Sequence, residues 1–472
     1  MIYLVPIFFV LIHYGLWLLF VKAGRPGWES LIPIYREYQI CKLIGRPIWW
    51  LALLLIPIIN VFIFFGLYLD LVKAFGKRRF WEYAATVLVP FIVLPIWGRD
   101  PLVRYLGRSA TAEFREKYPY QKSIGREWAD AIVFAIVAAT LIRGFLIEAY
   151  MIPTGSMERS LKVGDFLFVS KLNYGPRIPM TPIAFPFAHH TMPLTGGKAY
   201  WEGIKIPYKR IKGFQNIERN DVVVFNYPME ADAPFNRPID KRENYIKRAV
   251  GIPGDTIRSD ASVIYVNGKR GFVPPEGQID YQVYTDGSGL NSQRLIDQRI
   301  EANPYAREPY LLHLTQGAYE DVKSWSNITS ITPNVRPAGL AEPGTFPNAP
   351  GFNWNIDNFG PIIVPKAGWT IPLDSINIPL YHRAIQVYEG NTLEEKDGQF
   401  YINGELATSY TFKMNYYWMM GDSRHNSEDA RMWGFVPEDH IVGKALFVWL
   451  SLDKDGSFFS RIRWDRIFMG IN

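Results

Sequence analysis

The sequence predicts N-terminal transmembrane α-helices followed by a mostly β exported domain, built on a folded-over antiparallel sheet with a large irregular insertion. Three observations predict this fold class. Long apolar runs are confined to the first third of the 472 residues, basic residues flank those runs, and short β-type runs separated by turn signals occupy the rest. The mean hydropathy of −0.04 is therefore the average of a strongly apolar part and a polar part.

Four apolar segments in the first third have about the length that a bilayer core requires, roughly 20 residues. They span residues 1–21, 47–69, 80–97 and 129–149. Lys22 and Arg25 follow the first run, whereas a cleavable signal carries its positive charges before the apolar run. A retained membrane helix is therefore predicted there. The third segment is interrupted by Glu82 and two prolines, so the predicted number of transmembrane helices is three or four.

Basic residues between the apolar segments predict the orientation of the chain, because cytoplasmic loops of membrane proteins are enriched in lysine and arginine. The loop 99–128 is the richest, with Arg99, Arg104, Arg108, Arg115, Lys117, Lys122 and Arg126. If this loop is cytoplasmic, the segment 129–149 leads outward and everything after Tyr150 is exported. The protein is then a multi-pass protein of the inner (cytoplasmic) membrane. The basic loop 22–46 agrees with this topology, whereas the basic turn 73–79 would lie outside.

The chain after Tyr150 has the character of a β domain. Turn signals such as Val-Gly-Asp, Pro-Gly-Asp and Val-Asn-Gly separate short β-type runs. These runs are 166–169, 221–225, 245–250, 263–266, 401–402 and 445–450. Between Arg258 and Ser409 the chain becomes rich in Pro, Gly, Asn and Tyr, which predicts a large insertion into the β domain.

These features predict four regions. Residues 1–128 form a multi-helix membrane region with basic cytoplasmic loops, and residues 129–150 form the transmembrane helix that leads to the exported side. Residues 151–257 and 410–472 together form the β domain. Residues 258–409 form the insertion, a second β-rich subdomain.

Composition excludes several classes of site. Cys41 is the only cysteine, so neither an intrachain disulfide nor a thiol-based zinc site can form. No glycine-rich loop of the phosphate-cradling kind is present, and the sequence predicts no metal and no cofactor. The net charge of +6 could indicate nucleic acid, but the positive charges gather beside the membrane segments, where orientation explains them. No nucleic-acid partner is predicted.

Four separated blocks in the β domain carry chemistry-bearing residues. They are Ile-Pro-Thr-Gly-Ser-Met at 152–157 with its continuation to 165, Asn-Asp-Val-Val-Val-Phe at 220–225, Tyr-Ile-Lys-Arg-Ala-Val-Gly-Ile-Pro-Gly-Asp at 245–255, and Met-Gly-Asp-Ser-Arg at 420–424 with its continuation to 437. In this order, after an outward-leading helix, they resemble the bacterial type I signal peptidases. The resemblance covers the segment 129–150 and the β domain. It departs from the family after Met157, where Glu158 to Leu161 replace the usual Pro-Thr-Leu.

The resemblance implies that Ser156 is a nucleophile and Lys247 its base. An alcohol is a poor nucleophile until a base removes its proton. A free lysine titrates near roughly 10.4 and is charged at neutral pH. Lys247 can serve as a base only if burial disfavours its ammonium form, so the assignment predicts a buried lysine as well as a close one.

The resemblance also implies supporting roles for four side chains. The hydroxyl of Thr154 and the backbone N–H of Ser156 would stabilise the oxyanion of a tetrahedral intermediate. The hydroxyl of Ser427 would orient the lysine amine, and Asp429 and Arg431 would form a charged pair that braces this corner. Asp422 and Arg424 are expected to hold the turn rather than to touch substrate.

The implied function is a membrane-bound serine endopeptidase that removes N-terminal signal peptides from exported preproteins. It would cleave after small residues through an acyl-enzyme. The expected partners are preprotein signal peptides and membrane lipid, with a position close to the export machinery and an oligomeric state that the sequence leaves open. Two alternatives also stay open: a serine–histidine protease that uses His425 or His440, and a non-enzymatic membrane scaffold or sensor.

Overall fold

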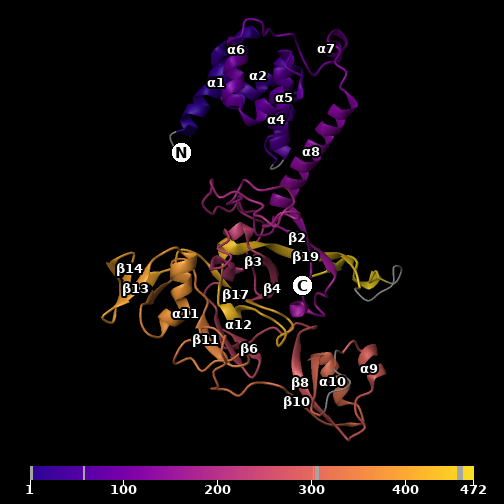
Figure 1. The fold of residues 1–472 in the computed structure, drawn as a ribbon, viewed down its shortest axis with the longest axis vertical. Coiled ribbons are helices and arrows are strands. Elements are labelled where there is room, and N and C mark those ends of the chain that lie inside the picture. The colour runs from indigo at the N-terminus through magenta and orange to yellow at the C-terminus, as the bar shows by residue number, and fades with distance from the viewer. Residues whose placement is uncertain (1–3, 57–58, 301, 303–307, 454–460, 472) are drawn as a thin grey trace. The chain divides into compact units, whose positions relative to one another are not determined.

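The computed structural model describes residues 4–56, 59–300, 302, 308–453 and 461–471. Its ribbon is shown in Figure 1. The chain divides into two compact units, Met1–Leu141 and Ile142–Asn472. Residues 1–3 of the first predicted membrane segment, 57–58 of the second, and 301 and 303–307 of the predicted insertion lie outside the described residues.

The first unit is helical. Its helices pack on a core of large apolar side chains, among them Leu16, Phe20, Ile40 and Leu67, none of which is exposed. The helices are α1 (Leu4–Lys22), η1 (Gly27–Ser30), α2 (Tyr35–Ile44), α3 (Trp50–Leu53), α4 (Ile59–Ala74), α5 (Phe80–Leu88), α6 (Pro90–Arg99), α7 (Ala112–Lys117) and α8 (Ile124–Phe145), the last of which runs across the boundary into the second unit.

Among the described residues, α8 is the single helix that is both long and apolar enough to cross a membrane. The most apolar stretch of α8 is not buried inside the protein, which fits a helix that faces lipid. Helices α5 and α6 are each too short to pass the same test and pass it only as a pair. The pair is bent by 118° at the break between them. Pro90 opens α6 and lacks a backbone N–H, and Val89 before it has left the helical conformation (φ −135°, ψ 49°).

The second unit is built on an antiparallel sheet whose strand order is β1-β2-β19-β3-β4-β17-β18, with β20 paired to β19. N-terminal helices followed by a mostly β domain are therefore confirmed. Breaks in register within β19 and between β17 and β4 bend the sheet, as β-bulges do. The strands are β1 (Ile147–Met151), β2 (Asp165–Ser170), β3 (Val222–Asn226), β4 (Asn244–Gly251), β17 (Tyr416–Met420), β18 (Val436–Pro437), β19 (Ile441–Ser451) and β20 (Met469–Gly470).

Both faces of this sheet are covered, as the burial of β3 shows. Val222 and Val224 point into one apolar cluster, which also contains Met157. Val223 and Phe225 point into a second cluster on the other face. Short helical turns and one helix decorate the sheet: η2 (Gly155–Met157), η3 (Pro228–Ala231), η4 (Ile239–Lys241), α12 (Ala430–Trp433), η6 (Glu438–His440) and η7 (Trp464–Arg466).

The region between β4 and β17 forms several small sheets. A sheet of order β11-β5-β6-β7 uses β5 (Thr256–Asp260), β6 (Val263–Val266), β7 (Lys269–Arg270) and β11 (Phe359–Ile363). A sheet of order β10-β8-β9 has its own apolar core and uses β8 (Gln278–Thr285), β9 (Tyr310–Thr315) and β10 (Ile328–Pro333), with α9 (Ser292–Asp297) and α10 (Gln316–Lys323). The remaining elements are β12 (Thr370–Pro372), α11 (Asn377–Arg383), the π-helical turn η5 (Ala384–Tyr388), β13 (Leu393–Lys396), β14 (Gln399–Ile402), β15 (Glu405–Leu406) and β16 (Ser409–Thr411).

Candidate active site

Ser156 lies in a single tight turn directly after strand β1. The chain is still extended at Thr154 (φ −131°, ψ 158°) and then forms the turn Gly155–Met157. Met157 is fully buried in the apolar core beneath the sheet, which fixes the turn, whereas Ser156 keeps 9% of its surface exposed. A side chain at Gly155 would approach Asn426 Nδ2 to 3.3 Å, so the turn passes close to the segment 421–431.

Lys247 reaches this serine from the middle of the sheet. It lies on β4, which is hydrogen-bonded to β3 on one side and β17 on the other. Its Nζ is 2.7 Å from Ser156 Oγ, although the two residues are 91 positions apart in the sequence. Lys247 is only 3% exposed. The structure thus brings the two predicted residues together, and it holds the lysine on a rigid element.

Burial changes the protonation of this lysine. Desolvation lowers the pKa of Lys247 from 10.5 to about 8, although the nearby carboxylates of Asp429 and Glu428 oppose the shift. At pH 7, roughly one lysine in ten is then neutral, against fewer than about one in a thousand for a free lysine. The neutral amine can accept the hydroxyl proton across the 2.7 Å contact, which is the condition that a lysine base must satisfy.

The loop that follows β17 contacts the turn that contains Ser156. The backbone N–H of Ser423 donates to the carbonyl oxygen of Ser156 at 3.2 Å. A Cβ at Gly421 would lie 2.5 Å from that same carbonyl oxygen and 2.2 Å from Ser427 Oγ. Only glycine therefore lets the two loops approach this closely.

An ion pair between Arg248 and Asp422 ties this loop to β4. Arg248 Nε and one Nη donate to the two carboxylate oxygens at 2.8 and 2.7 Å, and both side chains are buried. The Ser160 hydroxyl donates to the same carboxylate at 2.7 Å. Asp422 thus connects β4 with the segment that follows the turn of Ser156. The sequence reasoning assigned no role to Arg248 or Ser160.

Asp429 and Arg431 form a second buried ion pair. Arg431 Nε and one Nη each lie 2.8 Å from an oxygen of Asp429, and Gly421 N–H donates to Asp429 at 3.0 Å. Burial alone would raise the pKa of Asp429, but the Arg431 guanidinium outweighs it, so that the pKa is lowered. Because an unpaired buried charge is costly, removal of either partner is expected to destabilise the protein by about 3–5 kcal/mol.

The other two predicted supporting residues make fewer contacts. The Thr154 side chain is exposed and caps nothing at the start of the serine turn. Ser427 Oγ is buried beside Gly421 and Asp429, without a hydrogen bond of good geometry inside the described residues. Their roles toward the oxyanion and toward the lysine amine stay predictions.

A comparison with protein families identifies the family of this chain. The model of the signal peptidase family, peptidase S26, matches residues 125–303 and 387–450, which include both ends of the Ser156–Lys247 contact and the loop 421–431. The chain belongs to this family. It is therefore a hydrolase of the serine peptidase class. A second model, of a family of unknown function (DUF5684), matches residues 28–108 in the helical unit.

Individual relatives agree with this family. The chain is 26% identical to the signal peptidase I of Haemophilus influenzae over 402 residues, which cover 81% of this chain and 86% of the relative. It is 25% identical to that of Pseudomonas aeruginosa over 387 residues, covering 78% and 87%. It is 31% identical to that of Rickettsia massiliae over 332 residues, covering 70% and 81%.

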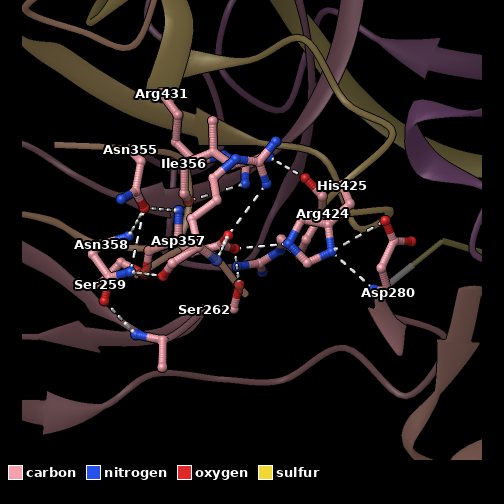
Figure 2. Close-up of polar contacts among 12 residues, drawn as sticks. Ser259, Ser262, Asp280, Asn355, Ile356, Asp357, Asn358, Arg424, His425 and Arg431 are labelled. Atoms are coloured by element: carbon pink, nitrogen blue, oxygen red, sulfur yellow. Dashed lines mark hydrogen bonds and ion pairs between the residues drawn. The ribbon is translucent and has the colours of Figure 1, made fainter. Parts of the chain in front are cut away.

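In this peptidase, the ring nitrogens of the two candidate histidine bases contact groups other than Ser156. His425 Nδ1 accepts the backbone N–H of Asp280 at 2.8 Å, and its Nε2 lies 2.7 Å from Asp357 Oδ1. Figure 2 shows both contacts. His440 Nδ1 lies 2.6 Å from Asp439 and its Nε2 lies 2.6 Å from Arg242. With both nitrogens of each ring engaged elsewhere, the geometry favours Lys247 over a histidine as the base.

Asp357 connects the peptidase loop with the region between β4 and β17. It is fully buried, and Figure 2 shows Ser262 and His425 beside its carboxylate. The backbone N–H of Arg336 donates to the same carboxylate at 2.9 Å. Burial alone would raise the pKa of Asp357, but hydrogen bonds from His425 and Ser262 outweigh it and hold the pKa well below its usual range. Because Asp280 N–H is a donor, His425 holds its own proton on Nε2 and donates it to Asp357. The sequence reasoning missed this link, since nothing pairs residues 357 and 425 along the chain.

No group of three or more histidine, cysteine or carboxylate side chains is arranged to hold a metal ion in the described ranges. Cys41 is buried in the helical unit as a free thiol.

Proposed function

We propose that the chain is a membrane-anchored signal peptidase that removes N-terminal signal peptides from exported preproteins with Ser156 as nucleophile and Lys247 as base. The observation that carries the proposal is the 2.7 Å contact between a buried, pKa-lowered lysine and a serine hydroxyl at the head of a tight turn. The names of the related proteins, signal peptidase I, supply the substrate class.

The reaction runs in two halves. The neutral amine of Lys247 takes the hydroxyl proton while Ser156 Oγ attacks the carbonyl carbon of the scissile bond. The Ser156 N–H and the Thr154 hydroxyl stabilise the oxyanion. Collapse breaks the C–N bond, and the lysine ammonium returns its proton to the leaving amine. Lys247 then takes a proton from a water molecule, which attacks the carbonyl carbon of the acyl-enzyme ester. The bond from this carbon to Ser156 Oγ breaks, the lysine ammonium returns its proton to Oγ, and the signal peptide leaves with a free carboxylate.

The buried ion pairs beside Ser156 and Lys247 hold the surrounding loops in position. Asp429 with Arg431 fixes the loop that lies against Ser156, and Ser427 on the same loop orients the amine of Lys247. Asp429 also opposes the fall in the pKa of Lys247, which leaves that pKa at about 8. A base whose pKa lies near the working pH combines availability with proton affinity.

The precursor binds as an added strand. β1 is an edge strand in the described sheet, so its free backbone groups can pair with an extended segment. Alternating side chains of that segment then point into the protein. The first and third positions before the cleaved bond share one face, and small residues such as alanine fit against the apolar neighbourhood of Ile152 and Met157.

The proposed architecture anchors this site at the outer face of the membrane. Residues 129–150 lead outward, residues 1–128 form the remaining membrane region with basic cytoplasmic loops, and 151–257 with 410–472 form the catalytic domain around the insertion 258–409. The bend of 118° supports α5 and α6 as a re-entrant segment rather than a full span. Signal peptides and membrane lipid are the partners, and the enzyme acts near the export machinery.

Cleavage of a preprotein in detergent tests the proposal. Wild type is expected to cut after a small residue, as the mass of the product shows, whereas Ser156→Ala and Lys247→Ala lose nearly all activity. Lys269→Ala is the matched control, because this lysine is exposed on β7. Full activity of Lys247→Ala would refute the base, and full activity of Ser156→Ala would refute the nucleophile.

A further inference from the structure

A cavity of about 630 Å³ begins directly after the nucleophile turn. Its wall is formed by residues 158–162, by Gln278 and Asn426, and by the C-terminal residues from Arg463 onward. Six basic side chains line it: Arg159, Lys162, Arg248, Arg299, Arg463 and Arg466. Only three carboxylates share the lining, so the wall is predominantly positive.

Four of these six cations are matched by a carboxylate of the protein. The pairs are Arg159–Glu276 at 3.0 Å, Arg248–Asp422 at 2.7 Å, Arg463–Asp453 at 3.3 Å and Arg466–Asp165 at 2.6 Å. Lys162 and Arg299 differ from the other four. Within the described residues, neither side chain has an ion pair or a hydrogen bond.

The pKa of Lys162 shows how the positive charges of the cavity act on one another. Burial lowers the pKa of Lys162, and the positive charges of Arg299 and Arg466 lower it further, while Glu158 opposes them. Like charges are therefore held together here, and Glu158 offsets them only in part, because the pKa of Lys162 is still lowered. A carboxylate placed between Lys162 and Arg299 would relieve this repulsion and satisfy donors on both sides.

The cavity lies where the chain of a bound precursor would continue. Asn426 and Glu158 line the cavity and also lie 3.3 and 3.7 Å from the Cβ position of Gly155, the residue before the nucleophile. β1 runs from α8 toward Ser156, and a precursor that leaves the membrane beside it runs in the same direction. Residues before the cleaved bond then lie along β1, and residues after it pass Ser156 toward 158–162.

We infer that this cavity binds an acidic side chain of the precursor, located a few residues after the cleaved bond, through Lys162 and Arg299. The inference rests on the proposed function and adds a specificity determinant to it. The enzyme would read the start of the mature protein as well as the end of the signal peptide, with charge as the criterion on the mature side.

A set of soluble peptide substrates, assayed in detergent without lipid, tests the inference. The peptides share one cleavage sequence and carry a single Asp, Asn or Lys at each of the first few positions after the cut. Wild type is expected to prefer Asp over Asn at one position by about five-fold in kcat/KM, the effect of a partly exposed ion pair. The preference should shrink as salt is raised to about 0.5 M.

Variants assign the preference to the cavity. Lys162→Met and Arg299→Gln are each expected to reduce the Asp-to-Asn ratio toward one, and Lys162→Glu should favour the Lys peptide instead. A loss of folded enzyme lowers the rates for all peptides equally and leaves the ratio unchanged. Lys396→Met, which removes an exposed lysine of β13, is the matched control and should keep the wild-type ratio.

Two results would overturn the inference while leaving the proposed function intact. One is equal cleavage of the Asp, Asn and Lys peptides by wild type at every position. The other is a preference for Asp that persists in both Lys162→Met and Arg299→Gln. If wild type cleaves none of the peptides and no preprotein, the proposed function itself fails, and the inference fails with it.

Discussion

Replacing the buried lysine by an uncharged side chain should make the peptidase inactive and more stable. Lys247→Met keeps the length and the apolar stem of the side chain but removes the ammonium group. The native lysine is 3% exposed and lies between two fully paired strands, so its charge has little access to water. Removing the group relieves the protein of the unfavourable burial of a charge.

The magnitude and sign follow from the pKa. Burial lowers the pKa of Lys247 from 10.5 to about 8, and each pKa unit corresponds to about 1.4 kcal/mol, so the charged lysine costs the folded state about 3 kcal/mol. The contact with Ser156 Oγ returns about 1 kcal/mol, which leaves a net gain of about 2 kcal/mol for the variant. The unfolded chain binds more protons between pH 8 and about 10.4, so wild-type stability rises with pH across that window. The net gain for Lys247→Met should therefore be full below pH 8 and fall across this window. Above about 10.4, where the lysine is neutral in both states, it should turn into a loss of about 1 kcal/mol, because only the contact with Ser156 Oγ is then missing.

Chemical denaturation of the purified protein in detergent, followed from about pH 6 to 10.5, measures this difference. Lys269→Met provides the matched control, since its exposed side chain should give no gain at any pH. A variant that is no more stable than wild type at pH 7 would refute the reasoning. So would a gain that stays constant through pH 10, because the cost would then not come from protonation of Lys247.

Three further outcomes are expected from the same geometry. In wild type, kcat/KM should rise about tenfold per pH unit below a midpoint near 8 and then level, because only the neutral amine of Lys247 is a base; a flat profile from pH 6 upward contradicts this. The double variant His425→Gln with His440→Gln should keep activity within about tenfold per folded molecule, whereas loss of a general base costs 10²- to 10⁴-fold; a loss of the latter size would favour a histidine base. Gly421→Ala should reduce kcat strongly, because its methyl group would lie 2.5 Å from the carbonyl oxygen of Ser156; wild-type kcat in this variant would mean that the two loops do not need this close contact.

The sequence was most informative where function and local pattern coincide. The β-type runs named from the sequence lie in strands, except that Asp221 precedes the first residue of β3, because alternation and turn residues act over a few neighbouring positions. The contact of Ser156 with Lys247 spans 91 positions, and its prediction came from the resemblance of the four blocks rather than from periodicity. Physical reasoning added one condition, burial of the lysine, and the structure meets it.

Other features depend on contacts that no local pattern encodes. Pro90 in the apolar run 80–97 indicates a break, but the angle of 118° between α5 and α6 cannot be read from a single proline. Asp357 and His425 are 68 positions apart, and neither lies in a recognisable motif with the other. The positive cavity collects residues from 158 to 471, so its charge appears only after folding.

The cross-link between the insertion and the catalytic loop limits how this enzyme can vary in length. Gln278 N–H donates to the carbonyl oxygen of Asp422 and Arg424 N–H donates to that of Gln278, so the first residue of β8 is paired with the loop that supports the nucleophile. Asp280 and Asp357, both from the insertion, contact the two ring nitrogens of His425. Shortening the connection between β8 and β9 spares all of these bonds, whereas loss of β9 itself would also remove the contact of His313 Nε2 with Ser423 Oγ at 2.7 Å. Excision of the whole region would free the loop that carries Asp429. Related sequences could therefore gain or lose residues between β8 and β9. The part of the insertion that contains Gln278, Asp280 and Asp357 would be retained together with Ser156.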